Sequence, residues 1–159
     1  MAQVSPSAPP ARRRPPRFLF RVLNPLFTLI LRSPLHGLLS GRLMLLTFTG
    51  RKSGKRYTIP VGYGQVDNTL LLGTEARWKH NLRGGAPISV RLRGRERDGV
   101  AEVIDDETGM QEHFRAMLAV APDYARAINV RLDRDGKPNP DDLARVRQEG
   151  HVGIRIRLD

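Results

Sequence analysis

The chain has no cysteine, and no Asp or Glu precedes Asp67. The first absence excludes disulfides, thiolate metal sites and cysteine nucleophiles, and it is neutral about the cellular compartment. The second absence places the whole net charge of +11 in residues 1–66, which carry eleven Arg and Lys, while the remainder of the chain is balanced. This asymmetry indicates an anionic partner, namely a phosphorylated small molecule, an anionic membrane surface or nucleic acid.

Several catalytic signatures are also missing. There is no G-x-S-x-G elbow and no Walker A motif. No metal site is predicted, because neither a His-x-x-x-His nor an HExxH pattern joins the four scattered histidines, which are His36, His80, His113 and His151. Aromatic residues make up only 6% of the chain, so a stacking platform for nucleic acid is not expected.

The N-terminal segment differs in composition from the rest. Residues 1–17 are mainly Pro, Ala, Ser and Arg, which predicts a disordered basic arm. Residues 18–33 predict an amphipathic helix that is too short to span a bilayer and lacks a small-x-small cleavage site. Two interpretations stay open: this helix packs on its own domain, or residues 12–32 contact an anionic membrane surface. The predicted localisation is cytoplasmic, with peripheral attachment to the inner face of the membrane as the alternative.

The 159 residues suit a single domain, predicted over residues 18–159, and from Gly41 onward the pattern is mainly β. Alternation predicts strands at 42–49, 56–66, 69–74, 88–93, 97–104 and 151–158, with turns at Asp67-Asn68 and Gly94. Asp105 or Asp106 is expected to cap a helix that ends near Pro122. A loop at 133–140 and a short helix from Pro140 to near Gly150 follow. Five or six antiparallel strands with a few helices predict a small β-barrel with peripheral helices.

The most informative motif is a cationic hairpin turn between the first two strands. Gly50 and Gly54 bound it and permit the positive φ of a tight turn. The turn gathers four cations beside Ser53 and several backbone N–H groups, namely Arg51, Lys52, Lys55 and Arg56. Like charges at this spacing repel, so the cluster predicts a phosphate ligand, with a solvated basic hairpin tip as the open alternative.

A second motif lies at residues 75–83. If this segment is a short helix, Trp78, Asn81 and Leu82 share one face. Trp78 is the only tryptophan, and with the Asn81 amide it resembles a shelf for a planar ligand. A core tryptophan is the alternative interpretation.

Together the two motifs resemble the deazaflavin-dependent nitroreductase family, also described as F420H2-dependent quinone reductases. The resemblance is carried by residues 49–54, by Pro60 and by Trp78-x-x-Asn81-Leu82, and it covers residues 18–125. It implies an α+β fold: a small antiparallel split β-barrel of the FMN-binding, pyridoxamine-phosphate-oxidase-like type with an N-terminal helix. It also implies hydride transfer from reduced coenzyme F420 to a quinone, nitro compound or similar electrophilic acceptor, by a monomer or homodimer.

The resemblance implies that the hairpin binds the coenzyme's phosphate and acidic tail. Arg51, Lys52 and Ser53 match the family's binders at this end. Tyr57 stands where many members carry an Arg, and the neighbouring Arg56 is a substitute for it.

For the reacting end, Pro60 matches a residue beside the deazaflavin ring, and Trp78 and Asn81 match the segment that lines the ring's pocket. Arg77 stands in for a longer Lys- and Gly-rich loop. Tyr124, in a Pro-x-Tyr segment, matches a position that contacts the acceptor. It is the predicted catalytic proton donor, with solvent as the alternative source of the proton. Residues 126–150 depart from the common ending of the family. The alternatives to an enzyme are an F420 or FMN binder without turnover and a basic protein that binds membrane or nucleic acid.

Overall fold

In the computed structural model of the chain, the described residues are Pro25 and residues 41–159. Three features predicted from the sequence lie outside the described residues and stay predictions. They are the basic arm (1–17), the amphipathic helix (18–33) and the membrane contact (12–32). No helix among the described residues is long and apolar enough to cross a membrane.

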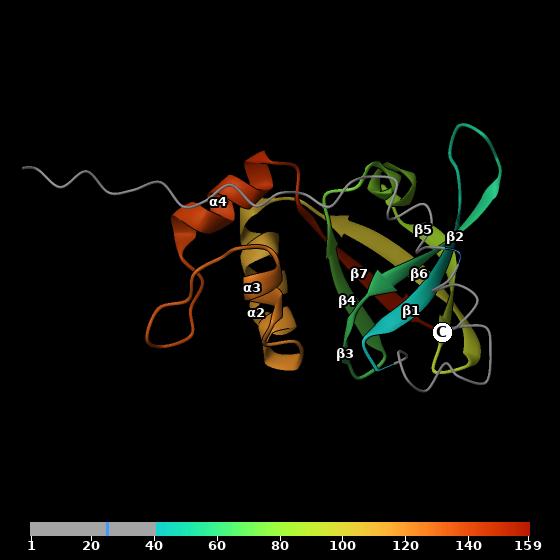
Figure 1. The fold of residues 1–159 in the computed structure, drawn as a ribbon. Helices are drawn as coiled ribbons and strands as arrows, with labels where there is room; N and C mark the ends of the chain where they lie inside the picture. The colour runs from blue at the N-terminus through green and yellow to red at the C-terminus, as the bar shows by residue number, and fades with distance from the viewer. Residues whose placement is uncertain (1–24, 26–40) are drawn as a thin grey trace, which may run out of the picture.

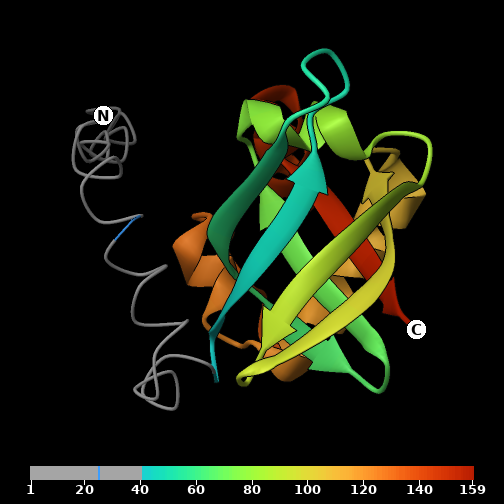
Figure 2. The ribbon, with the colours of Figure 1, turned by 90° about the vertical axis from the view of Figure 1, so that its right-hand side faces the viewer.

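The domain is built on one seven-stranded antiparallel sheet with the order β2-β1-β5-β6-β7-β4-β3. The two edge strands, β2 and β3, are separated in the chain by Tyr63 alone. The sheet therefore curls until its two edges approach each other, which gives the half-barrel seen in Figures 1 and 2. The α+β split-barrel fold is thus confirmed. The strands are β1 (Leu43–Thr49), β2 (Arg56–Gly62), β3 (Gly64–Val66), β4 (Thr69–Thr74), β5 (Ala86–Leu92), β6 (Arg95–Ile104) and β7 (Val152–Leu158).

The strand predictions are correct except at one point. The expected strand 56–66 is broken at Tyr63, so the sheet has seven strands where five or six were expected. The break arises because β2 pairs with β1, whereas β3 pairs with β4 at the opposite edge. Two turns match the sequence: Asp67 adopts a φ of 50° in the β3–β4 turn, and Arg93 and Gly94 adopt φ values of 48° and 80° between β5 and β6.

Within residues 41–159, four helical segments accompany the sheet: η2 (Arg77–Leu82), α2 (Glu107–Val120), α3 (Tyr124–Ala127) and α4 (Pro140–Gln148). The Asp106 side chain caps α2 by accepting a hydrogen bond from the Gly109 N–H at 2.8 Å. The helix ends at Val120, before Pro122, as predicted. Asn139 caps α4, whose first residue is Pro140.

The helices α2 and α3 lie close to the outer face of the sheet because glycines leave room for them. A Cβ on Gly73 of β4 would lie 1.8 Å from the Tyr124 hydroxyl, and one on Gly153 of β7 would lie 2.6 Å from the His113 ring. The interior of the barrel is aliphatic, with Leu70, Leu72, Ile154 and Ile156 among its fully buried members. A second apolar cluster joins α2, α3 and α4 and consists of Phe114, Ala125, Val130, Leu143 and Val146.

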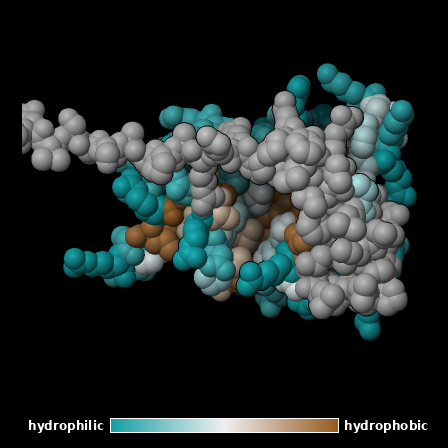
Figure 3. Space-filling model, viewed as in Figure 1, coloured by the Kyte–Doolittle hydropathy of each residue, from teal (hydrophilic) through white to brown (hydrophobic). Residues whose placement is uncertain are grey.

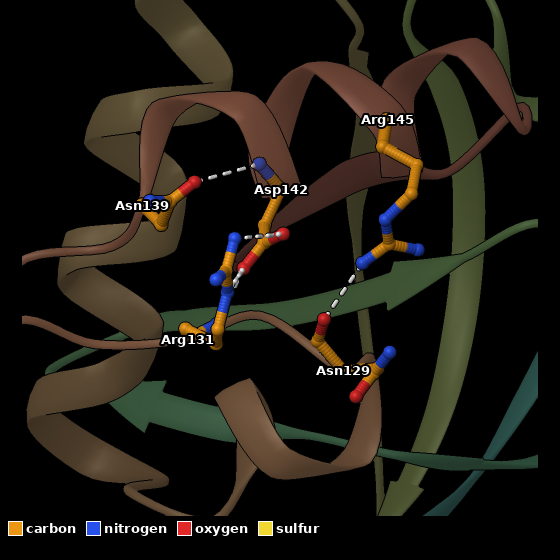
Figure 4. Close-up of polar contacts among 5 residues, drawn as sticks. All are labelled: Asn129, Arg131, Asn139, Asp142 and Arg145. Atoms are coloured by element: carbon orange, nitrogen blue, oxygen red, sulfur yellow. Dashed lines mark hydrogen bonds and ion pairs between the residues drawn. The ribbon is translucent and has the colours of Figure 1, made fainter. Parts of the chain in front are cut away.

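Polar contacts fix α4 against the segment that precedes it (Figure 4). Arg131 donates to both carboxylate oxygens of Asp142, at 2.8 Å from Nε and 3.2 Å from an Nη, and its backbone N–H donates to the same group at 2.9 Å. These hydrogen bonds hold the pKa of Asp142 below its usual value. Asn139 accepts from the Asp142 N–H at 3.1 Å, and Arg145 donates to the Asn129 carbonyl at 2.7 Å. The position of α4 is therefore defined at both of its ends.

Candidate functional site

The β1–β2 loop, defined as residues 50–56 and so including the first residue of β2, forms a closed turn that projects from one end of the barrel (Figure 1). The Gly50 N–H donates to the Lys55 carbonyl at 2.8 Å, and the Gly54 N–H donates to the Gly50 carbonyl at 2.9 Å. Gly54 has a φ of 65°, as the turn requires. A Cβ on Gly50 would lie 2.5 Å from the Ser53 Oγ and 2.7 Å from the Tyr57 ring. The two glycines therefore permit this tight closure.

The cations of the loop are exposed and have no acidic partner among the described residues. Hydrophilic side chains cover the loop at the upper right of Figure 3. Within residues 41–159, no carboxylate lies within 4.0 Å of the four cationic groups, which belong to Arg51, Lys52, Lys55 and Arg56. Four unpaired cations in one loop provide a positive potential that an anionic group would neutralise.

Fewer backbone donors remain in the loop than the sequence suggests. The N–H groups of Gly50, Gly54 and Arg51 all donate within the protein, and the Lys55 N–H donates to the Ser53 Oγ at 3.3 Å. Side-chain cations, more than backbone N–H groups, are therefore the donors that this loop offers to an anion.

The 3₁₀ helix η2 supports the loop through Asn81. The Asn81 Oδ1 accepts from the Arg51 N–H at 3.0 Å, while its Nδ2 donates to the Trp78 carbonyl at 3.0 Å. The guanidinium of Arg51 also donates to the His80 carbonyl at 3.4 Å. The Asn81 amide thus joins the loop to η2. Its predicted contact with a ligand stays a prediction.

An aromatic stack lies beneath the loop. The ring of Phe48 lies 5.8 Å from that of Tyr57 and 5.8 Å from that of Trp78, at 27° to each. Tyr57 is 43% exposed, and its hydroxyl is 3.1 Å from the Ser53 Oγ. Sequence reasoning missed Phe48, which was visible only as an apolar residue of β1. Phe48 pairs with Tyr57 across β1 and β2, and this register is what would have indicated its place in the stack.

Pro60 lies apart from Trp78. Along β2, Tyr57, Ile59 and Val61 face the interior cluster, so Pro60 faces the other side of the sheet. As β2 is an edge strand, the missing N–H of Pro60 is tolerated there. Arg77 is exposed at the start of η2.

Tyr124 occupies a different part of the molecule. Its ring lies 5.5 Å from that of Phe114, and its hydroxyl is hydrogen-bonded to the His151 Nε2 at 2.7 Å. Burial raises the pKa of the Tyr124 phenol above its usual value and lowers the pKa of His151. The phenol therefore keeps its proton at neutral pH. The structure brings the loop and η2 residues together and places Tyr124 with the helices.

The comparisons with known proteins bear on this arrangement. The sequence model of the F420H(2)-dependent quinone reductase family matches residues 33–135, which include the loop, the aromatic stack and η2. The chain belongs to this family. Membership supports an F420-dependent reductase, and the name of the family supports F420 as the coenzyme. No curated protein matches the chain.

Solved structures resemble this member of the quinone reductase family more weakly. An F420-H2-dependent reductase is 15% identical, with 74% of this chain and 94% of that chain covered and a TM-score of 0.49. An FAD-binding protein from Mesorhizobium loti is 19% identical, with coverages of 84% and 88% and a TM-score of 0.49. An FAD- and heme-binding protein from Mycobacterium smegmatis is 18% identical, with coverages of 80% and 67% and a TM-score of 0.47.

The residues present suit a phosphorylated coenzyme at its anionic end. The loop supplies unpaired guanidinium and ammonium groups together with the Ser53 hydroxyl, which are the usual donors to a phosphate. Among the described residues, no group of three or more His, Asp or Glu side chains is arranged to hold a metal ion.

Proposed function

We propose that the protein is an F420H2-dependent reductase that transfers a hydride to a quinone, a nitro compound or a similar electrophilic acceptor. The observation that supports this most strongly is the cluster of unpaired cations in a loop held by Asn81, in a chain that belongs to the quinone reductase family. Arg51 and Lys52, with Ser53 and Arg56, bind the phosphate end of the coenzyme. Binding energy from this remote group then fixes the reacting end.

At the reacting end, the protein positions and encloses its ligands. Bound in its reduced form, the deazaflavin supplies the hydride. Trp78, supported by Phe48, provides an apolar wall that excludes water from the ring, and Tyr57 borders the same stack. Pro60 and Arg77 are proposed to contact the coenzyme from β2 and from the start of η2.

Tyr124 is proposed as the donor of the proton that completes reduction of the acceptor. Burial raises the pKa of its hydroxyl, which therefore stays protonated, and the hydroxyl is hydrogen-bonded to the His151 Nε2. If this role is correct, Tyr124→Phe lowers kcat more than it changes KM for the acceptor, because the lost group acts in the transition state.

The test is a turnover assay in which oxidation of reduced F420 is followed with quinone and nitro acceptors, in parallel with FMN in its reduced form. Acceptor-dependent oxidation of F420H2 that is lost in the double variant Arg51→Ala/Lys52→Ala is the expected result. Arg134→Ala is the control, because Arg134 is an exposed cation on the 133–140 loop. Binding of F420 without turnover would make the protein a binder of the coenzyme, and a preference for FMN would change the coenzyme assignment.

A further inference from the structure

A cavity of about 500 Å³ lies beside η2, between it, the C-terminal half of α4 and the start of β7. In Figure 2 these segments lie at the top of the barrel, at the same end as the β1–β2 loop. None of the residues of this cavity belongs to the loop. Its lining includes three cations, Lys79, Arg83 and Arg147, and one carboxylate, Asp105.

Lys79 is the central residue of this cavity. Its side chain leaves the residue only 7% exposed, and its Nζ donates to the carbonyls of Glu75 and Gly150. Within residues 41–159, no carboxylate lies within 4.0 Å of this ammonium. An ammonium has three donors, so these two carbonyls leave one of them unused. A buried cation without a counter-ion is unfavourable, and an anion in the cavity would offset that cost.

Two guanidinium groups accompany Lys79. The Nε of Arg147 is buried and has no hydrogen-bond partner in the described part of the chain, and an Nη of the same group lies 3.7 Å from Glu107. Arg83 is held at the wall by Asp105, with 2.8 Å between the Nη and the carboxylate oxygen. Arg147 therefore retains donor capacity that its ion pair does not use.

The wall that carries Arg147 lies outside the part of the chain that the family model matches. The family match ends at residue 135, whereas α4 begins at Pro140. The contacts of Asp142 and Arg145 described above hold α4 in place (Figure 4), so Arg147 is presented by an anchored helix. His151 borders the same cavity, with its Nε2 occupied by the Tyr124 hydroxyl.

We propose that this cavity binds an oxyanion group of a small molecule, a phosphate or a carboxylate, with Lys79 and Arg147 as its direct ligands. Arg83, fixed by Asp105, adds positive potential at the rim. Charge-assisted hydrogen bonds from an ammonium and a guanidinium are the usual means of holding such groups. This binding does not depend on binding of the coenzyme at the β1–β2 loop.

Titration of the protein with inorganic phosphate, and separately with succinate, at low ionic strength tests this site. Backbone amide NMR signals report the location: Gly150 and His151 report the cavity, and Lys52 and Ser53 report the loop. Saturable shifts at Gly150 and His151 are expected, with affinity about tenfold weaker in Arg147→Gln, since one charge-assisted hydrogen-bonding group is lost. Lys79→Gln is expected to weaken binding at least as much. Arg134→Gln, which removes the same charge from an exposed loop, is expected to bind as the parent does.

Two results would overturn the cavity site. One is an absence of saturable shifts at Gly150 and His151, whether no signal shifts or only those of Lys52 and Ser53 do. The other is an unchanged affinity in a folded Arg147→Gln variant. Neither result bears on coenzyme binding at the loop. Conversely, if phosphate binds at the cavity but the protein does not bind F420, only the proposed function is contradicted. Repeating the titration with F420 present separates two sources of the oxyanion: displacement of phosphate assigns the cavity to part of the coenzyme, and continued binding assigns it to a separate anion.

Discussion

The arginines of the β1–β2 loop and those of the helical side illustrate two uses of the same residue type. The helical side is the part of the molecule formed by α2, α3, α4 and the sheet face they cover. On the helical side, Arg131 pairs with Asp142 and Arg145 with Glu149. In the loop, Arg51 and Arg56 have no carboxylate partner among the described residues. The pairs stabilise packing within the protein, whereas the unpaired cations are available to a ligand.

The largest effect is expected on the helical side from Gly73→Ala. The added Cβ would overlap the Tyr124 hydroxyl, 1.8 Å away, and would displace α3 from the sheet. We expect a loss in the free energy of unfolding at or above the upper end of about 1–3 kcal/mol, as overpacking of a core typically causes. Urea unfolding measures it. Gly41→Ala is the matched control, because nothing lies within 4 Å of its Cβ position; equal losses in both variants would contradict the close packing of α3.

A second effect on the helical side depends on pH. Burial lowers the pKa of His113 from 6.5 to about 4, and its Nε2 donates to the Leu72 carbonyl at 2.9 Å. The pKa of His113 is lower in the folded state than in the unfolded state. The stability that the neutral ring contributes is therefore fully present above pH 6.5 and is lost as the pH falls toward 4. The linked loss is about 3 kcal/mol.

Chemical unfolding of the parent and of His113→Gln between pH 7 and pH 4 measures this effect. The variant keeps a donor for the Leu72 carbonyl and is expected to show a flatter dependence on pH. The exposed His80, changed to Gln, serves as the control and should leave the curve unchanged. If the free energy of unfolding depends on pH equally steeply in the parent and in His113→Gln, a group other than His113 controls the pH dependence.

At the loop, Asn81→Ala tests whether η2 holds the unpaired cations in place. The change removes the acceptor for the Arg51 N–H and the donor to the Trp78 carbonyl, so the loop loses its link to η2. We expect about 1 kcal/mol of lost stability and weaker binding of F420, since a less ordered loop must be fixed on binding. Hydrogen exchange at the Arg51 amide is the direct readout. An unchanged exchange rate there would contradict the supporting role of Asn81.

The smallest effect is expected from Asp142→Asn. Hydrogen bonds from Arg131 lower the pKa of Asp142, so its contribution is present above the carboxyl's unfolded pKa of about 4 and is lost as the pH falls below it. The variant is expected to have a slightly lower Tm at pH 7, and the difference in Tm from the parent is expected to shrink as the pH falls below 4. Asp135→Asn, at an exposed position of the 133–140 loop, controls for the change in charge. A Tm difference that does not shrink at all as the pH falls would point to altered packing instead.

Local signals in the sequence predicted the elements well. The Asp106 cap, the Asp67-Asn68 turn and the glycine-bounded hairpin are each determined by a few neighbouring residues. The break at Tyr63 was missed because it depends on which strand each half of the segment pairs with. That information lies in the curl of the whole sheet and not in the alternation of residues 56–66.

The candidate site was predictable in composition and less so in geometry. The sequence identified the cations and Trp78, but Phe48 becomes part of the stack only through its register with Tyr57. The link from Asn81 to the loop spans 30 residues. The pairing of Tyr124 with His151 likewise depends on α3 packing over Gly73. Such contacts are set by tertiary structure, and no short motif encodes them.

The central claim is that the unpaired cations of the β1–β2 loop bind the phosphate end of F420. Fluorescence titration of the parent, Arg51→Ala, Lys52→Ala and the control Arg134→Ala with F420, at low and moderate salt, tests it most directly. The account predicts binding that weakens with salt and about tenfold in each loop variant, with no change in the control. Equal affinity in the parent and in both loop variants would contradict it.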